Sequence, residues 1–445
     1  MTHSLKGGFF MNSIWTRSAK FPQFPQLQGD TKTDILIVGG GIAGILCAYF
    51  LKEQGIDYIL VEGKTICSGV TKNTTAKITS QHGLIYHKLV KDIGIEKAAM
   101  YLQANQEALR MYEELCQNIN CNFEIKPSYV YSLDDPWKIE QELSALGEVR
   151  FEAHYSKAEE LPFEVAGAVC FEHQAQFHPL KFIASIVGDL NIYEHTFVKE
   201  LKEKEAVTDL GKISFEKIIF ATHFPMDNKH GMYFLKMYQH RSYVIALKNA
   251  PKLEGMYVDE RDKGFSFRNY NDYLFLGGGS HRTGKTGGNW SELREYTNKY
   301  YPEAKEITFW ATQDCMTLDR IPYIGQYSKF KRNYYVATGF NKWGMTSSMT
   351  AAKILIDLVM EKENPYAEVF NPSRSIIKPQ LFINMGESAV NLLTFTEKRC
   401  PHLGCALKWN EVERSWDCPC HGSRFDEDGG VIDNPATGDL KDIKF

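Results

Sequence analysis

Four residues near the C-terminus have the types and the spacing of a metal site. Cys400 and His402 form one pair, Cys418 and His421 form a second pair, and fifteen residues separate the pairs. Each pair offers one thiolate and one imidazole. Two sulfide-bridged iron atoms need this set if one iron takes two Cys and the other two His, and His ligation raises the reduction potential of such a cluster.

Zinc is the main alternative for the same four ligands, since zinc also accepts two Cys and two His. Zinc ligands usually come as separate Cys and His pairs, whereas here each pair mixes the two types. Cys405 and Cys420 add one further Cys to each half. The mixed pairs and the extra Cys favour iron over zinc.

A glycine-rich turn near the N-terminus has the spacing of a dinucleotide-binding site. Gly39, Gly41 and Gly44 lie between a short apolar strand and an apolar helix. These glycines permit a tight turn, close approach of a pyrophosphate, and close packing of helix on strand. Glu62 ends the next expected strand and can accept hydrogen bonds from a ribose. The turn alone does not separate FAD from NAD.

Later segments resemble the glycine-oxidase and D-amino-acid-oxidase superfamily of FAD enzymes, in the superfamily's order. They are Ser68-Gly-Val-Thr71-x-Asn73-Thr74-Thr75-Ala76, the strand at 218–222, Asp319-x-x-Pro322-x-x-Gly325 and Gly339-Phe-x-x-x-Gly344-Met345-Thr346. The resemblance implies FAD, with its isoalloxazine between the nucleotide domain and an antiparallel substrate sheet. The implied FAD contacts are Gly39, Gly41, Ile42, Ala43, Gly44, Glu62, Thr71, Thr74, Thr75, Ala76, Thr222, Gly339, Gly344, Met345 and Thr346.

The two C-terminal pairs resemble the loops of Rieske [2Fe–2S] domains, over about residues 379–445. The motifs are Cys400-Pro-His402-Leu-Gly-Cys405 and Cys418-Pro-Cys420-His421-Gly-Ser423. The resemblance implies Cys400, His402, Cys418 and His421 as cluster ligands, and a proline loop at Asn434-Pro435 over the cluster. About twenty residues precede Cys400 in this module, fewer than the family usually has, so its base is either trimmed or borrowed from the rest of the chain.

The same resemblance implies a disulfide between Cys405 and Cys420, with two free buried thiols as the alternative in a reducing compartment. Ser423 matches a residue that donates a hydrogen bond to a bridging sulfide. Phe425 stands where high-potential Rieske domains carry Tyr. Because a lost donor stabilises the reduced cluster less, we expect a potential below that of the respiratory kind.

Composition indicates an ordinary globular protein of two or three domains. The chain has 445 residues, of which 43% are hydrophobic and 24% charged, values typical of soluble proteins. A formal charge of −4 argues against a nucleic-acid partner. No apolar run approaches the length of a transmembrane segment. Six of the ten Cys are scattered and four gather in the tail, which favours a reduced, cytoplasmic protein with one local metal module.

The expected fold class is α/β and α+β: a Rossmann-like FAD-binding domain, an antiparallel-sheet substrate domain, and a small all-β Rieske module. The expected segments are an N-terminal extension at 1–29, an oxidoreductase body at 30–363, a linker at 364–378 and the module at 379–445. Within the body, FAD-binding segments are expected at about 30–120, 170–225 and 315–363, and the substrate sheet at about 121–169 and 226–314. Long helices are expected at 85–118, 136–146 and 344–360.

Both features together resemble a bacterial group of FAD-dependent oxidoreductases with a C-terminal Rieske domain. The combination implies a converter between two-electron and one-electron chemistry. Our hypothesis is oxidation of a small amine, amino acid or imino acid, with electrons passing singly through the cluster to an external acceptor. Reversed flow from an external donor protein fits nearly as well, and a non-catalytic redox sensor is a further alternative.

Residues that contact the substrate are less determined. His281 lies at the end of an expected strand, where it either faces the flavin or is a solvated loop residue. Arg241 and Tyr243, together with Arg268, could hold a carboxylate, since a guanidinium fork matches that group. Residues 379–445 carry seven Lys or Arg and eleven Asp or Glu, so an acidic surface could steer a basic redox partner.

Overall fold

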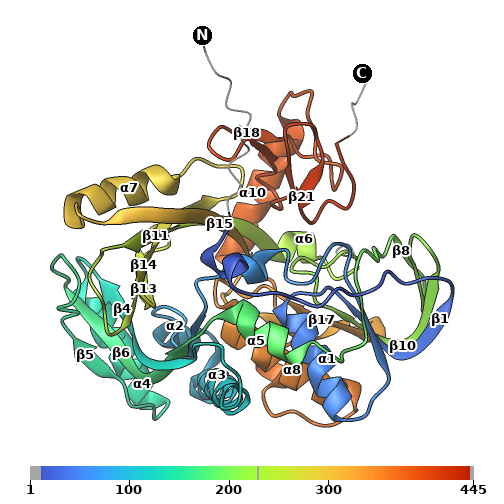
Figure 1. Ribbon diagram of the computed structural model, residues 1–445, viewed down its shortest axis with the longest axis horizontal. Helices are drawn as coiled ribbons and strands as arrows, with labels where there is room; N and C mark the ends of the chain where they lie inside the picture. The colour runs from blue at the N-terminus through green and yellow to red at the C-terminus, as the bar shows by residue number, and fades with distance from the viewer. Residues whose placement is uncertain (1–11, 228–229, 441–445) are drawn as a thin grey trace.

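The computed structural model describes residues 12–227 and 230–440, and within them the chain folds around three sheets (Figure 1). The first eleven residues of the expected extension and the last five of the expected module lie outside the described residues. Two large sheets form the body, and a small four-stranded sheet lies against one side of it. The expected fold class is therefore observed.

The first sheet carries the nucleotide end and has eight strands, with the main order β16-β17-β10-β1-β2-β7. Its core strands β17, β10, β1, β2 and β7 are parallel, and their inner residues form nearly continuous apolar runs because both faces of the sheet are covered. Helices α1 (Ile42–Glu53) and α8 (Gly344–Val359) pack against each other on this sheet. The strands are β1 (Thr31–Val38), β2 (Tyr58–Val61), β7 (Ile192–Tyr193), β8 (Glu200–Leu201), β9 (Glu205–Val207), β10 (Lys212–Phe220), β16 (Tyr323–Ser328) and β17 (Lys331–Thr338).

The second sheet is the expected antiparallel sheet and has nine strands, with the main order β15-β11-β14-β13-β12-β4-β6-β3. Only β12 and β4 are paired in parallel along this order within the described chain. Its strands are β3 (Lys77–Ile78), β4 (Glu124–Ser132), β5 (His154–Ser156), β6 (Gly167–Gln176), β11 (Met237–Lys248), β12 (Met256–Asp259), β13 (Ser266–Tyr270), β14 (Tyr273–Arg282) and β15 (Lys305–Thr317). Helix α7 (Asn289–Tyr300) covers part of one face, where Trp290 meets Tyr243 of β11.

Of the remaining helices of the body, two regions were expected, and one of them is broken. The long helix expected at 85–118 is two helices, α2 (Tyr86–Ile93) and α3 (Ile95–Cys116), because Gly94 adopts a φ of 85° that ends the first one. Helix α4 (Pro136–Glu148) begins as expected, with Asp135 accepting a hydrogen bond from the Lys138 N–H at 3.4 Å. The short helices are α5 (Pro179–Ile186) and α6 (Tyr233–Lys236), with 3₁₀ turns η1 (Ile14–Arg17) and η2 (Val70–Asn73).

The described part of the expected N-terminal extension packs into the body. Trp15 of η1 is fully buried, and its Nε1 donates to the Thr74 carbonyl at 2.7 Å. Its ring also meets Tyr270 and Phe275 of the second sheet edge-on. The segment therefore fixes one of the predicted FAD-contacting residues against the substrate sheet.

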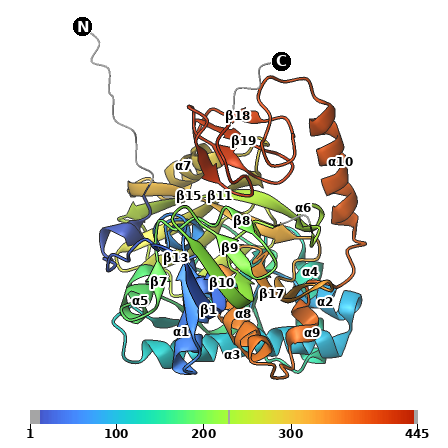
Figure 2. The ribbon, with the colours of Figure 1, turned by 90° about the vertical axis from the view of Figure 1, so that its right-hand side faces the viewer.

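The C-terminal module begins with a helix before its strands. Helix α9 (Ala367–Phe370) lies in the expected linker, and α10 (Pro379–Leu393) runs along the side of the body up to the small sheet (Figure 2). The antiparallel strands are β18 (Lys408–Asn410), β19 (Ser415–Asp417), β20 (Arg424–Phe425) and β21 (Val431–Asp433). The residues that precede Cys400 thus form mainly a helix, and the all-β part of the module rests on the body instead of on extra strands of its own.

Helix α10 turns polar side chains inward. Asn384 and Asn391 are buried, whereas Phe382 and Val390 are exposed. The reason is on the body, where the Arg282 guanidinium donates to Asn384 Oδ1 at 2.9 Å. No helix in the described residues is long and apolar enough to cross a membrane.

Candidate functional site

The glycine turn between β1 and α1 leaves no room for a side chain at two of its three motif glycines. Gly39 has a φ of 113°, and a Cβ there would lie 2.6 Å from the Ala221 carbonyl oxygen. A Cβ on Gly44 would collide with the Gly39 carbonyl oxygen. Gly41, in contrast, faces open space apart from the Thr71 hydroxyl at 3.4 Å. The turn therefore has the close packing and the open approach that a pyrophosphate needs.

Glu62 and Thr71 hold this turn in place. The Glu62 carboxylate accepts hydrogen bonds from the backbone N–H of Gly40 and of Lys64, both at 2.8 Å. The Thr71 hydroxyl accepts from the Ile42 N–H at 3.1 Å, at the start of α1. Both side chains converge where the sequence predicts the cofactor, and each keeps lone pairs for a ligand.

A single cavity of about 1080 Å³ starts at the glycine turn and reaches the second sheet. Drug-sized ligands usually occupy about 300–1,000 Å³, so this central cavity has room for a dinucleotide and a small second molecule. Twelve of the predicted FAD contacts line it: Gly39, Gly41, Ile42, Ala43, Glu62, Thr71, Thr74, Thr75, Thr222, Gly339, Gly344 and Met345.

Three predicted FAD contacts lie behind the wall of the central cavity. Gly44 packs on Gly39, as described above. The Ala76 carbonyl accepts a hydrogen bond from Arg268 Nη1 at 2.8 Å. The Thr346 hydroxyl donates to the Thr79 carbonyl at 2.7 Å and so joins α8 to the segment that follows β3. Arg268 is buried in this packing and is not a carboxylate clamp.

Arg241, Tyr243 and His281 lie together, and the group that joins them comes from the module. Glu413, in the turn between β18 and β19, accepts hydrogen bonds from Arg241 Nε at 3.0 Å and from the Tyr243 hydroxyl at 2.9 Å. His281 Nε2 lies 2.9 Å from the same hydroxyl. Arg241, Tyr243 and Glu413 line the central cavity, and His281 stands behind Tyr243.

Glu413 is a buried charge with two cationic partners. Its carboxylate pairs with Arg241 through Nη2 as well as Nε, and with Arg424 Nη2 at 2.9 Å. Burial alone would raise the pKa of Glu413, but Arg241 and Arg424 hold it at about 2. No local pattern in the sequence marks this residue, since its partners in the body, Arg241 and Tyr243, lie about 170 positions away.

The four metal-ligand candidates meet at the tip of the module. Two loops present them, and each loop is closed by a backbone bond of 2.9 Å, from Gly404 N–H to the Cys400 carbonyl and from Gly422 N–H to the Cys418 carbonyl. The rings of His402 and His421 have centroids 5.0 Å apart and are nearly perpendicular. The sulfurs of Cys405 and Cys418 and a ring nitrogen of His421 all lie within 4.8 Å of one another.

The chemistry of this site fits an iron–sulfur cluster. The buried side chains of Cys400 and Cys418 lie within hydrogen-bonding distance of each other, so one metal atom could take both sulfurs as ligands. His421 is buried, and neither of its ring nitrogens has a nitrogen or oxygen hydrogen-bond partner among the described residues. Such unsatisfied nitrogens are expected of a metal ligand. The Ser423 hydroxyl accepts from the Ala436 N–H at 3.0 Å, which ties the proline loop to the site.

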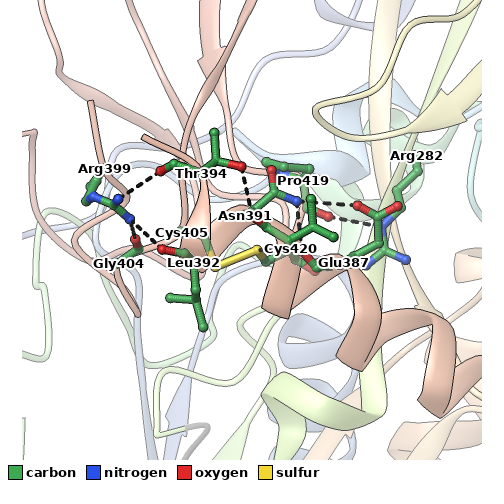
Figure 3. Close-up of a disulfide and its surroundings, with 11 residues drawn as sticks. Arg282, Glu387, Asn391, Leu392, Thr394, Arg399, Gly404, Cys405, Pro419 and Cys420 are labelled. Carbon is green, nitrogen blue, oxygen red and sulfur yellow. Dashed lines mark hydrogen bonds between the residues drawn. A yellow bond between two sulfur atoms is a disulfide. The ribbon is translucent and has the colours of Figure 1, made fainter. Parts of the chain in front are cut away.

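A disulfide between Cys405 and Cys420 joins the two loops (Figure 3). On one side, Arg399 donates to the carbonyls of Gly404 and Thr394 at 2.8 and 2.9 Å. On the other side, Arg282 of the body donates to the Cys420 carbonyl at 3.1 Å. The loops are therefore fixed to each other and to the body.

The histidine side of the site faces the body. The His402 ring meets Phe224 with centroids 6.3 Å apart, and the His421 ring meets Phe234 at 6.2 Å. A Cβ on Gly422 would collide with Gln239 of β11. The cluster loops are thus packed directly on the second sheet, with their imidazoles at the contact.

Two glutamines connect the cluster loop to the wall of the central cavity. Gln239 Nε2 donates to the His421 carbonyl at 3.1 Å and to the Asn434 carbonyl at 2.8 Å. Gln313 Nε2 donates to the Gly422 carbonyl at 2.9 Å and to Gln239 Oε1 at 2.8 Å. His223 Nε2 lies 3.3 Å from the same Gln239 oxygen and lines the cavity.

The proline loop also contacts the body, next to the glutamine contacts of the cluster loop. Asn434 Nδ2 donates to the Thr222 carbonyl at 2.6 Å, and Thr222 is a predicted FAD contact. The peptide bond between Asn434 and Pro435 is cis. Residues 431–437 of the module line the central cavity together with the body. One cavity wall is therefore built by both parts of the chain.

Comparison with known proteins finds two family matches in this chain. Residues 34–358 match the family of FAD dependent oxidoreductases, and residues 378–444 match the Rieske [2Fe-2S] domain. The putative Rieske 2Fe-2S iron-sulfur protein YhfW of Bacillus subtilis (strain 168) is 34% identical over 97% of each chain.

Two solved structures resemble about three quarters of this chain in fold. Glycine oxidase from Geobacillus kaustophilus superposes with a TM-score of 0.64 and 19% identity, covering 77% of this chain and 99% of its own. L-proline dehydrogenase from P. horikoshii superposes with a TM-score of 0.65 and 17% identity, covering 78% of this chain and 98% of its own. At these identities the likeness concerns the fold.

Proposed function

Because the chain belongs to the family of FAD-dependent oxidoreductases and carries a C-terminal Rieske [2Fe–2S] domain, we propose that it oxidises a small amine, amino acid or imino acid and passes the electrons singly to an external acceptor. Bound FAD supplies two-electron oxidation, and the bound cluster supplies one-electron transfer. The proposal also assigns residues 30–363 to the oxidoreductase and 379–445 to the electron-transfer module, with 364–378 as the linker.

The observation that carries the proposal is the shared wall of the central cavity. Residues 431–437 and Glu413 of the module line the same cavity as the glycine turn. His402 and His421 face the body, and Gln239 and His223 lie between the cluster loop and that cavity. This arrangement supports the proposal, because a cluster held by these loops would lie beside the proposed flavin site.

The choice of substrate class rests on weaker support. The proteins of similar fold are a glycine oxidase and an L-proline dehydrogenase, which by name act on an amino acid and an imino acid. The central cavity is lined on the second sheet by polar side chains, including Ser242, Ser280 and Thr312. A small polar substrate suits such a surface.

The test is an anaerobic titration of the holoprotein with a panel of amines, amino acids and imino acids. We expect one class of substrate to bleach the flavin absorbance and then to reduce the cluster, seen as its visible and electron-paramagnetic-resonance signals. A one-electron oxidising dye should then return both the flavin and the cluster to their oxidised spectra. Bleaching of the flavin without any reduction of the cluster would contradict the electron route.

The direction of electron flow is tested in the same preparation. Reduction of the cluster by an artificial one-electron donor should leave the flavin mostly oxidised if the chain works as a dehydrogenase. Rapid reduction of the flavin through the cluster, together with turnover of an imine or a keto acid, would instead support the reverse reaction from an external donor protein.

A further inference from the structure

Two oppositely charged side chains line the central cavity without a hydrogen-bonded or ion-paired partner among the described residues. Asp314 lies on β15, opposite His240 of β11. Lys342 lies in the turn between Gly339 and Gly344, just before α8. Both line the cavity, and neither forms a hydrogen bond or an ion pair with any residue in 12–227 or 230–440.

Most other charges on the second-sheet side of the cavity are already paired. Arg241 donates hydrogen bonds to Glu413 through both Nε and Nη2, so this pair of nitrogens is not available to a substrate carboxylate. Asp259 pairs with Arg261 at 2.8 Å, and Glu260 pairs with Lys138 at 2.7 Å. The pairing of Arg241 removes the clamp that the sequence suggested.

The remaining lysines on the wall belong to the nucleotide side. Lys64 and Lys72 are neighbours of Glu62 and Thr71 in the segments that hold the glycine turn. Lys77 is buried in β3 and donates to the Thr75 hydroxyl at 3.4 Å. Asp314 lies on the second sheet itself, and Lys342 lies in the turn just before α8. Among the described residues, we therefore take these two as the unpaired charges of the substrate side.

The protein leaves both charges poorly compensated. Burial raises the pKa of Asp314 to about 6, although Lys342 and Arg241 act against this rise. Burial lowers the pKa of Lys342, although Asp314 and Asp262 act against this fall, and Arg320 adds to it. Each group senses the other but lies beyond ion-pair distance. A ligand with a cationic and an anionic end would satisfy both groups at once.

We infer that Asp314 and Lys342 bind the two ends of a zwitterionic substrate, with Asp314 on the ammonium and Lys342 on the carboxylate. This inference rests on the proposed function and narrows it: the substrate class is a free amino acid or imino acid, and simple amines are excluded. Arg241, Tyr243 and Glu413 then form the wall behind the site and hold the module in place.

The experiment measures binding by perturbation of the flavin spectrum of the anaerobic holoprotein. The probes are matched sets that keep the carbon skeleton: proline, pyrrolidine and cyclopentanecarboxylate, and glycine, methylamine and acetate. We expect at least one zwitterion to bind about ten- to a hundredfold more tightly than its matched amine and its matched acid, the effect of one charge-assisted hydrogen bond.

Two variants separate the ends of the site. Asp314→Asn should weaken binding of zwitterion and amine by about tenfold or more and leave the acid unchanged, and Lys342→Met should weaken zwitterion and acid and leave the amine unchanged. Asp314→Glu should restore part of the affinity. Glu260→Gln is the matched control, because it neutralises a cavity carboxylate that already has Lys138 as a partner.

Several outcomes would overturn the inference. Amines that bind as tightly as their amino acids, no perturbation by any zwitterion of the panel, or unchanged affinities in both variants would each do so. A shift of the flavin midpoint potential in Lys342→Met without loss of acid affinity would assign this lysine to the cofactor instead. Tight zwitterion binding without flavin bleaching would leave the inference standing and contradict the proposed function.

Discussion

At the residue scale, Glu413 joins the two parts of the chain through a buried ion pair. It lies in the module, its partners Arg241 and Tyr243 lie in the body, and all three side chains are almost fully buried. A buried charge that loses its partner costs more than the pair contributes, because the remaining charge stays desolvated. This contact therefore penalises separation of the module from the body.

Glu413→Gln should lower the stability of the protein by about 3 kcal/mol, since Arg241 would remain buried without its counter-ion. Differential scanning calorimetry at neutral pH would measure this as a lower Tm. Glu411→Gln is the control, because Glu411 is an exposed residue of the same turn. Equal Tm values for both variants would show that the pair contributes nothing.

The same carboxylate predicts a pH dependence. The pKa of Glu413 is depressed from its ordinary value of 4.5 to about 2. Its contribution to stability is complete above about pH 4.5 and is lost as the pH falls toward 2, because the unfolded chain binds the proton first. Tm measured against pH should fall less steeply over this range in Glu413→Gln than in the wild type.

Phe425 is the residue from which we predict a low reduction potential of the cluster, because it lacks the hydroxyl of a Tyr. It is fully buried and packs with Cys400 and Cys418. Phe425→Tyr should raise the midpoint potential by roughly 50 mV, the equivalent of one hydrogen bond of about 1.2 kcal/mol in a one-electron couple. Protein-film voltammetry measures it, and a lower potential in the variant would contradict the assignment.

At the element scale, the interface depends on alternation along β11. The side chains of Gln239, Arg241 and Tyr243 all form hydrogen bonds with the module. Alternate residues of a strand point to the same face, so these three share the face toward the module. Val244 lies instead in the main core with Trp15. Strand β11 thus supports the cluster loops on one face and the core on the other.

Gly422 is where the module comes closest to β11. Its φ of 87° and the predicted collision with Gln239 mean that Gly422→Ala should displace the cluster loop and cost about 1–3 kcal/mol. Stopped-flow mixing with substrate should show slower reduction of the cluster after the flavin bleaches.

Gly404→Ala is the matched control for this variant. Gly404 lies in the other cluster loop with a φ of 79°, and its Cβ would meet only Leu392 at 4.0 Å. Both substitutions strain the backbone alike, so the difference between them isolates the contact with the body. Equal rates of cluster reduction in the two variants would contradict a role for this contact.

Local signals in the sequence were sufficient to predict most elements but not their junctions. β2 and the start of α4 at Pro136 fall where the pattern predicts them, because periodicity and the Asp135 cap act over a few residues. The break at Gly94 was missed, because a glycine inside a helical pattern is often tolerated. Helix α10 was missed because its apolar residues face outward, against the usual pattern.

The candidate site divides in the same way. Motif residues such as Gly39 and Cys418 could be placed from spacing, because one short loop carries the geometry. Arg241 and Tyr243 were chosen as possible carboxylate ligands of a substrate, and they do lie together. Their partner Glu413 could not be found, since contacts across about 170 positions leave no periodic trace. Asp314 and Lys342 stand out only once the paired charges around them are known.

At the scale of the whole molecule, the two cofactors share a wall. Residues 431–437 line the cavity that holds the predicted FAD contacts, and the Ala436 N–H joins them to Ser423 in the loop that carries Cys418 and His421. Binding at two sites that share a structural part is coupled, and the coupling acts equally in both directions.

Cys418→Ser should therefore remove the iron and also weaken FAD binding, by about tenfold if the coupling is of ordinary size. Iron assay and fluorescence titration of the apoprotein with FAD measure the two effects. Cys170→Ser, a buried Cys in β6 away from the cavity, is the control. Unchanged FAD affinity in an iron-free Cys418→Ser protein would contradict the coupling.

The shared wall also bears on how the protein matures. A ribosome releases the chain from its N-terminus, so the glycine turn emerges long before the segment that closes the cavity over it. The cavity wall that residues 431–437 contribute is complete only after the tail has emerged, and the coupling proposed above links that wall to the bound iron. We therefore expect cells starved of iron to accumulate a polypeptide that is pale in both colours, lacking the yellow of its nucleotide along with the red of its metal.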